Sequence, residues 1–157
     1  MRYKMTYLAL AALLVLPAIL LISSCKKEVT PYKTPFFHIN VDNKNTVEVL
    51  SNRKDIVDYK VYLSAELQFD PITVQYEVIV GNGLLAGRDF DLITTGTTLN
   101  FAPGIFERPI TIAWKQSTLD PSKDNTIRIR LVSNSKNYIM GLPGPDQLQR
   151  ELIITKK

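Results

Sequence analysis

The sequence predicts an all-β protein, an antiparallel β-sandwich of seven to eight strands. Residues 72–80 show this best, because apolar and polar side chains alternate along them with a period of two. Clusters of Gly, Pro, Asn and Asp separate further runs of the same kind, and sustained helical periodicity does not occur after residue 35. Short alternating runs between turns are typical of two facing sheets with a core about 10 Å thick.

The first half of the domain contains four such runs, which are expected at residues 36–41, 46–50, 58–65 and 72–80. In the first run Phe37, Ile39 and Val41 share one face, and a polar turn follows. A strand that switches from one sheet to the other would explain the short second run. The third run places Tyr59 on its apolar face and Tyr62 on its polar face.

The second half contains the remaining runs, which are expected at residues 90–93, 98–101, 107–114, 125–133 and 149–155. A turn is predicted after residue 101, because Pro103 fixes φ and Gly104 permits unusual dihedral angles. Trp114 has the parity of the apolar face of its strand, which favours a core position over an exposed one. Arg128 and Arg130 share the opposite, outward face of their strand.

The N-terminus resembles a bacterial lipoprotein signal peptide. A basic start with Arg2 and Lys4 precedes an apolar stretch at residues 8–22, and Ser23 and Ser24 lead to Cys25. Fifteen residues fall short of the roughly 20 that span a bilayer as a helix. We therefore expect a cleaved helical signal peptide at residues 1–24 and lipidation of Cys25, with an uncleaved anchor as the alternative. Because this is the chain's one cysteine, no disulfide can form within the chain.

Residues 25–35 read as a lipidated tether, with charged residues at the start and prolines at 31 and 35. Ten extended residues reach up to roughly 30 Å from a membrane. Lys26, Lys27 and Glu28 resemble the surface-export signals of Bacteroidetes lipoproteins, although a solvated tether has the same composition. The domain then occupies residues 36–157. The chain carries a net charge of +4, or +2 without Arg2 and Lys4, which with its lack of basic runs argues against nucleic acid as a partner.

The order of the motifs in the domain resembles the Calx-β family. The residues that carry the resemblance are 71–78, the Ala86-Gly87-Arg88-Asp89-Phe90 turn, 99–104, 110–112, 127–131 and 152–154. The resemblance implies an immunoglobulin-like Greek-key sandwich. Some members of the family bind Ca²⁺ at the loop end of the sandwich, and many bacterial members are adhesion or surface modules. A bound Ca²⁺ is therefore the only cofactor that the resemblance makes possible.

Calcium binding would require six to eight oxygen ligands from several loops. Asp89 matches the family pattern residue for residue, while Asp120 and Asp124 lie in the corresponding loop without matching its acidic pattern. The loop after Trp114 has Lys115 and Gln116 where the calcium-binding members have acidic residues. Asp89, Asp120 and Asp124 are thus the candidate metal ligands, and an Asp89 that accepts backbone N–H bonds in its turn is the alternative.

Candidate ligand-binding residues are the aromatic and basic side chains Tyr62, Trp114, Arg128 and Arg130. An exposed, flat aromatic ring beside hydrogen-bonding groups would suit a glycan, and the arginine pair would suit an acidic sugar or a partner. His38, the chain's one histidine, lies on the polar face of an early strand, so a hydrolytic triad is not expected. Phosphate-loop and zinc-ligand spacings do not occur in the sequence.

These observations predict a non-enzymatic binding or spacer module, anchored by lipid in the cell envelope, with the outer membrane as the expected location. It would bind another envelope protein as its partner or serve in adhesion. The first alternative is an accessory glycan-binding lipoprotein, and the second alternative is a calcium-binding Calx-β module.

Overall fold

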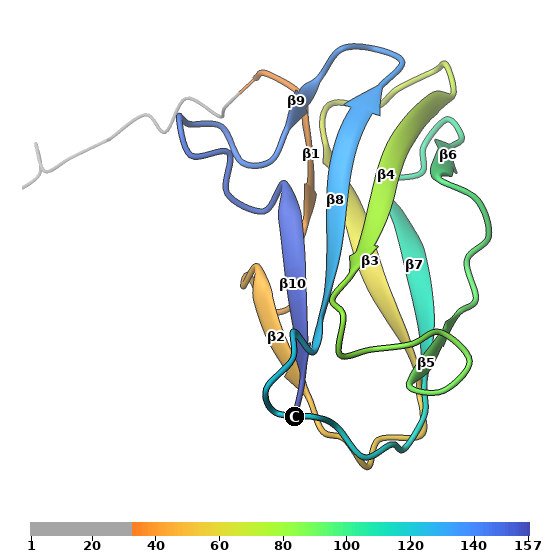
Figure 1. The fold of residues 1–157 in the computed structure, drawn as a ribbon. Helices are drawn as coiled ribbons and strands as arrows, with labels where there is room; N and C mark the ends of the chain where they lie inside the picture. The colour runs from red at the N-terminus through yellow and green to blue at the C-terminus, as the bar shows by residue number, and fades with distance from the viewer. Residues whose placement is uncertain (1–32) are drawn as a thin grey trace, which may run out of the picture. The chain divides into compact units, whose positions relative to one another are not determined.

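The computed structural model describes residues 33–157, which form one compact unit, Lys33–Lys157. Within this unit two five-stranded sheets pack face to face, and no helix occurs in residues 33–157 (Figure 1). The signal peptide expected at residues 1–24, and the tether as far as residue 32, lie outside the described residues. The prediction of an all-β sandwich is therefore confirmed for the described domain.

The strands, in chain order, are β1 (Phe36–Ile39), β2 (Thr46–Val49), β3 (Ile56–Ser64), β4 (Ile72–Val80), β5 (Phe90–Leu92), β6 (Thr98–Phe101), β7 (Glu107–Trp114), β8 (Thr126–Asn134), β9 (Ile139–Met140) and β10 (Glu151–Lys156). The first sheet has the order β5-β7-β3-β1-β9, and the second sheet has the order β2-β10-β8-β4-β6. The bounds of the nine alternating runs expected from the sequence agree with strands of the structure to within two residues.

Two predicted features of the sheets are wrong. The described domain has ten strands rather than seven to eight, and both sheets are mixed rather than purely antiparallel. The parallel pairs are β1 with β9 and β2 with β10. The chain crosses from the first sheet to the second between β1 and β2, where Asp42 and Asn43 have φ values of 51° and 62°. This crossing is the sheet switch that the short second run suggested.

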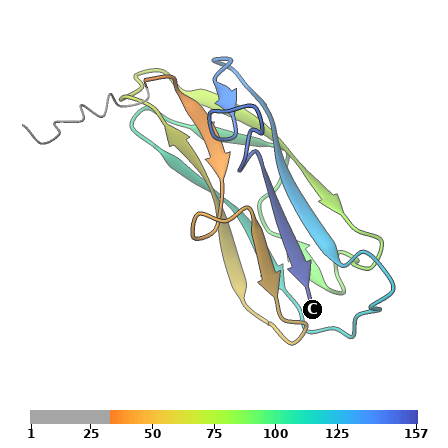
Figure 2. The same cartoon turned by 90° about the vertical axis from the view of Figure 1, so that its left-hand side faces the viewer.

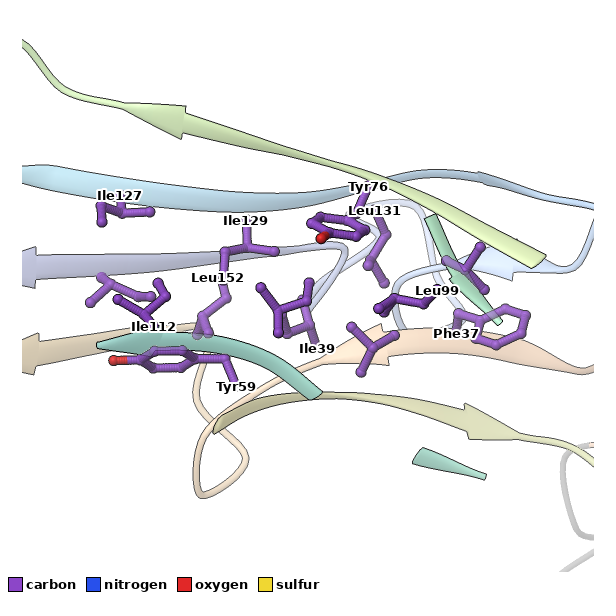
Figure 3. Close-up of a cluster of buried hydrophobic side chains, with 14 of the residues drawn as sticks. Phe37, Ile39, Tyr59, Tyr76, Leu99, Ile112, Ile127, Ile129, Leu131 and Leu152 are labelled. Carbon is purple, nitrogen blue, oxygen red and sulfur yellow. The ribbon is translucent and has the colours of Figure 1, made fainter. Parts of the chain in front are cut away.

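The core lies between the two sheets and consists of the side chains on the inward face of each strand. Figure 3 shows Ile127, Ile129 and Leu152 of the second sheet facing Ile39 and Ile112 of the first, and all five side chains are fully buried. Burying an aliphatic or aromatic side chain of this size contributes about 1.5–3 kcal/mol. The buried core of the described unit runs from Phe37 to Ile154, so residues 33–157 contain a core of their own.

The sandwich has two ends, which the strand pairing defines. At the β1 end, Phe36 pairs with Ser64, so the start of β1 lies beside the β3–β4 loop. At the C-terminal end, Lys156 pairs with Val49, so the last residues of the chain lie beside the β2–β3 loop. Figures 1 and 2 show both relationships, with the C-terminus at the opposite end from the start of β1.

Candidate functional site

Asp89 lies in the β4–β5 loop at the C-terminal end and is fully buried. Its Oδ2 atom accepts hydrogen bonds from the Leu85 N–H at 2.7 Å and from Arg88 Nε and Nη2 at 2.9 and 2.7 Å. Arg88 Nη2 also donates to the Gly83 carbonyl oxygen at 2.9 Å. The carboxylate therefore holds the loop together, as the turn interpretation of Asp89 predicted.

The charge of Asp89 is maintained by its neighbours. Burial of the carboxylate acts to raise its pKa, but hydrogen bonds from Arg88, Ser117 and Leu85 outweigh that effect and lower the pKa from its ordinary 3.8. The second oxygen, Oδ1, is buried, and no group within residues 33–157 donates a well-formed hydrogen bond to it. The Ser117 side chain nevertheless lies close enough to lower the pKa of the carboxyl group. A buried carboxylate oxygen of this kind has a high cost unless a positive charge lies nearby.

Arg88 supplies one such charge, 2.7 Å from Oδ2, and a second is Lys156, at the end of β10, which is only 1% exposed. Its Nζ donates hydrogen bonds to the carbonyl oxygens of Asp89 at 3.0 Å and Lys115 at 2.6 Å, and to Ser117 Oγ at 2.8 Å. It also lies 5.8 Å from the ring centroid of Trp114, within the range of a cation–π contact. Desolvation lowers the pKa of Lys156, and the charge of Asp89 acts against that change.

Sequence reasoning missed the buried position of Lys156, although a signal for it exists. Lys156 has the same parity as Leu152 and Ile154, both fully buried, so the alternation of β10 directs it inward. The expected strand ended at residue 155, one residue too early. The ammonium group therefore closes the C-terminal end of the core.

A pocket of ≈ 980 Å³ lies outside this closure, at the C-terminal end. Six of its lining residues carry hydroxyl or amide groups, Ser51, Asn52, Gln116, Ser117, Thr118 and Asn125, but Leu119 and Pro121 also line it and most of its surface is apolar. Lys156 reaches its wall, but its three hydrogen-bond donors are already used within the domain. Lys157 also lines the pocket and is paired with Glu48. The pocket thus combines an apolar surface with hydroxyl and amide groups.

The three predicted metal ligands are not brought together. Asp120 Oδ1 accepts from the backbone N–H and the hydroxyl of Ser122, at 3.0 and 2.6 Å. Asp124 Oδ1 accepts in the same way from Thr126, at 3.2 and 2.7 Å. Among residues 33–157 no group of three or more His, Cys, Asp or Glu side chains could hold a metal ion. Asp89 instead stabilises the β4–β5 loop, and Asp120 and Asp124 each accept hydrogen bonds at separate points of the β7–β8 loop.

Trp114 and Tyr62 point to different sides of the first sheet. Trp114 is 2% exposed, and its Nε1 donates to the Tyr59 hydroxyl at 3.0 Å, so it is a core residue and its ring is not accessible to a glycan. Tyr62 lies half-buried on the outer face, where it stacks on His38 with a centroid distance of 5.4 Å and an interplanar angle of 29°. The two rings therefore cannot form one binding platform.

His38 and Tyr62 border a smaller pocket of ≈ 370 Å³, which Asn40, Asn43 and Glu107 also line. His38 Nδ1 lies 3.1 Å from both Gln149 Oε1 and Asn40 Nδ2. The side chains that hydrogen-bond to His38 within the described residues are thus amides and not carboxylates. Desolvation lowers the pKa of His38, against the opposing effect of the Gln149 hydrogen bond.

The two arginines on β8 are in different environments. Arg130 Nε lies 2.7 Å from Glu151 Oε2 and its Nη1 lies 3.1 Å from Glu77 Oε1, so its charge is compensated within the second sheet. Arg128 is half-buried on the same face, opposite Ile79 and Ile153. The structure therefore keeps the pair on one face but occupies Arg130 with internal ion pairs.

Cys25, the predicted lipidation site, lies outside the described residues. Within residues 33–157 there is no helix with the length and apolar character that a membrane span requires. The sequence matches no protein-family model, and no curated protein is significantly similar to it.

Proposed function

We propose that this chain is a lipid-anchored cell-envelope protein whose β-sandwich serves as a non-enzymatic binding or spacer module. The observation that carries the proposal is Cys25, the chain's one cysteine, which directly follows an apolar stretch that ends in two serines. Two or three acyl chains would hold the protein firmly, because each buried methylene contributes about 0.8 kcal/mol of membrane affinity. The outer membrane is the proposed location.

The finer fold assignment is an immunoglobulin-like Greek-key sandwich of the Calx-β kind. The switch of the chain between β1 and β2 supports it, since the two halves of the first strand then lie in different sheets. The parallel pairing of β2 with β10 supports it as well. The turn that contains Asp89 is part of the sequence resemblance, and in the folded loop the Asp89 carboxylate accepts hydrogen bonds from Leu85 and Arg88.

The polar clusters of the domain support a binding or spacer role over a reaction. Asp89 and Lys156 hold the C-terminal end of the core, and His38 contacts two amide side chains at the crossing between β1 and β2. Each of these groups is occupied by bonds that maintain the fold. The surfaces that remain for a partner are the outer faces of the sheets and the loops at both ends.

The experiment that tests the anchoring is the substitution Cys25→Ala in the full chain, followed by metabolic labelling with a palmitate analogue. The matched control is Ser24→Ala, which keeps a small residue before the cysteine. We expect the wild type and Ser24→Ala to carry the label in the membrane fraction, and Cys25→Ala to carry none. Full processing and membrane retention of Cys25→Ala would show that the anchoring proposal is wrong.

Glycan binding is the second candidate, and one observation favours it. The Tyr62 ring, the Asn40 and Asn43 amides and the Glu107 carboxylate border one pocket, which combines an aromatic surface with hydrogen-bonding groups. Retention of residues 33–157 on immobilised polysaccharides tests this candidate. Tyr62→Ala should abolish the retention while Phe69→Ala, which removes a highly exposed aromatic ring elsewhere, should leave it unchanged. Equal retention of both variants would exclude this site.

A further inference from the structure

The β1 end carries an exposed apolar patch, formed by two loops. Leu67 and Phe69 of the β3–β4 loop are 56% and 81% exposed, and Ile105 and Phe106 of the β6–β7 loop are 41% and 37% exposed. The loops adjoin, since Leu67 Cδ1 lies 3.9 Å from the point that a Cβ atom on Gly104 would occupy. Single exposed apolar residues are ordinary, but four on two adjoining loops suggest a contact surface.

The patch lies at the end of the domain where the chain enters it from the N-terminal side. Phe36, the first residue of β1, pairs with Ser64, the residue that immediately precedes the β3–β4 loop. Ile72 pairs with Phe101, which places the β6–β7 loop at this end too. Figures 1 and 2 both show the start of β1 and the β3–β4 loop together at this end.

The charges around the patch cancel. Lys33, Arg108 and Lys136 are opposed by Glu66, Asp70 and Glu107, and Lys136 Nζ lies 2.9 Å from Asp70 Oδ2. The Tyr138 hydroxyl also donates to Gln68 Oε1 at 2.7 Å, so the β3–β4 loop is fixed on both sides of Phe69. The patch at the β1 end is thus held in place and is surrounded by charges that sum to zero.

We propose that this patch contacts the lipid bilayer to which the chain is anchored, with Phe69 and Leu67 inserted at the boundary between headgroups and acyl chains. This inference rests on the proposed lipid anchor at Cys25. Residues 26–35 can extend by only roughly 30 Å, so the β1 end is held close to the membrane at a high effective concentration. Under that condition even a small apolar surface binds, and a net charge near zero makes the contact independent of anionic lipids.

The C-terminal end offers a matched control. Leu50 is 65% exposed, which is between the values for Leu67 and Phe69, but it lies in the β2–β3 loop at the far end of the strands. The nine residues of β3 separate the two ends by about 30 Å. If the β1 end inserts in the membrane, Leu50 remains in water.

The experiment uses residues 33–157, which contain their own core and no cysteine. A histidine tag placed before Lys33 attaches the domain to phosphatidylcholine vesicles that contain a nickel-chelating lipid. An environment-sensitive fluorophore is attached in separate proteins to Phe69→Cys and Leu50→Cys. We expect a blue shift of the emission and quenching by brominated acyl chains at position 69, and neither change at position 50. Doubling the salt concentration should not alter the result.

Three outcomes would overturn the inference. An unchanged emission at position 69 on vesicles would mean that the patch does not enter the bilayer. Equal shifts at positions 69 and 50 would mean that the domain adsorbs without a preferred end. A blue shift at position 69 that grows with protein concentration in the absence of vesicles would assign the patch to a second copy of the chain. Because the tag replaces the native lipid, these outcomes are separate from a failure of acylation at Cys25.

Discussion

The ammonium nitrogen of Lys156 lies 3.0 Å from the carbonyl oxygen of Asp89, at the point where the C-terminal end of the core closes. Both residues are buried, and they come from chain segments 67 residues apart. The last strand is thus fixed to the β4–β5 loop by a charged hydrogen-bond donor. Because the ammonium group is buried and makes three hydrogen bonds, we expect the domain to depend on it strongly.

Lys156→Met should destabilise the domain, because it leaves the Lys115 carbonyl oxygen and the Ser117 hydroxyl without this donor, while the Asp89 carbonyl oxygen keeps only the Lys115 N–H. An unsatisfied buried group costs about 1–3 kcal/mol, so we expect a loss of about 2–4 kcal/mol in the free energy of unfolding. Urea unfolding of residues 33–157 measures this loss. The control is Lys157→Met, whose side chain is 55% exposed and pairs with Glu48, and which should change stability by less than about 1 kcal/mol. Equal unfolding midpoints for the two variants would contradict the structural role of Lys156.

Calcium should not stabilise the domain. Asp89, Asp120 and Asp124 are each used by hydrogen bonds within their own loops, and they do not converge. A cation present at 100 times its dissociation constant would add about 2.7 kcal/mol, which moves the thermal midpoint by several degrees. We expect the same midpoint in EDTA and in millimolar Ca²⁺. A clear rise in Ca²⁺ that disappears in Asp124→Asn would restore the calcium interpretation.

The domain should lose stability as the pH falls from about 7 to about 5, because of His38. Desolvation lowers the pKa of His38 in the folded state below its ordinary 6.5. Below pH 6.5 the unfolded chain therefore binds a proton that the folded domain resists, so stability is complete above pH 6.5 and falls towards the folded pKa. The midpoint of urea unfolding, measured across this range, should follow this course.

The variant His38→Gln separates this effect from other titrations. His38 is the chain's one histidine, so the variant should show a flatter dependence of the midpoint on pH between about 5 and 7. An unchanged slope in His38→Gln would mean that another group is responsible.

Tyr59→Phe should weaken the domain by about 1 kcal/mol, because it removes the hydroxyl that accepts the Trp114 Nε1 proton. The ring itself remains, so packing in the core is retained. Trp114 is the chain's one tryptophan, so its fluorescence reports both the buried ring and the unfolding transition. The control is Tyr62→Phe, on the outer face, which should leave the midpoint unchanged. A Tyr59→Phe midpoint equal to the wild type would contradict the buried hydrogen bond.

Alternation along the strands was sufficient to predict most of the fold, because burial of one face imposes a period of two. It placed Tyr59 and Trp114 in the core correctly. It could not predict β9, whose two residues are too few to show a period, or the parallel pairs, which depend on where the chain crosses between sheets. These features depend on contacts between distant segments.

The candidate site was less predictable than the fold. Asp89 could be identified as a turn residue, but its pairing with Lys156 depends on how the β4–β5 loop meets the end of β10. Asp120 and Asp124 are close in sequence, yet each accepts hydrogen bonds from the residue two positions later, and neither belongs to a group within residues 33–157 that could hold a metal ion. Loop conformations of this kind follow from local hydrogen bonds, which residue parity does not describe.

The measurement that tests the central proposal most directly is the intact mass of the mature protein, purified from the membrane fraction of cells that express the full chain. A lipid-anchored envelope module predicts a chain that begins at Cys25 and carries the added mass of a diacylglycerol group, with or without a further acyl chain. Base treatment should remove the ester-linked chains. An unmodified mass for a chain that begins at Met1, or at any residue after Cys25, would contradict the lipid anchor.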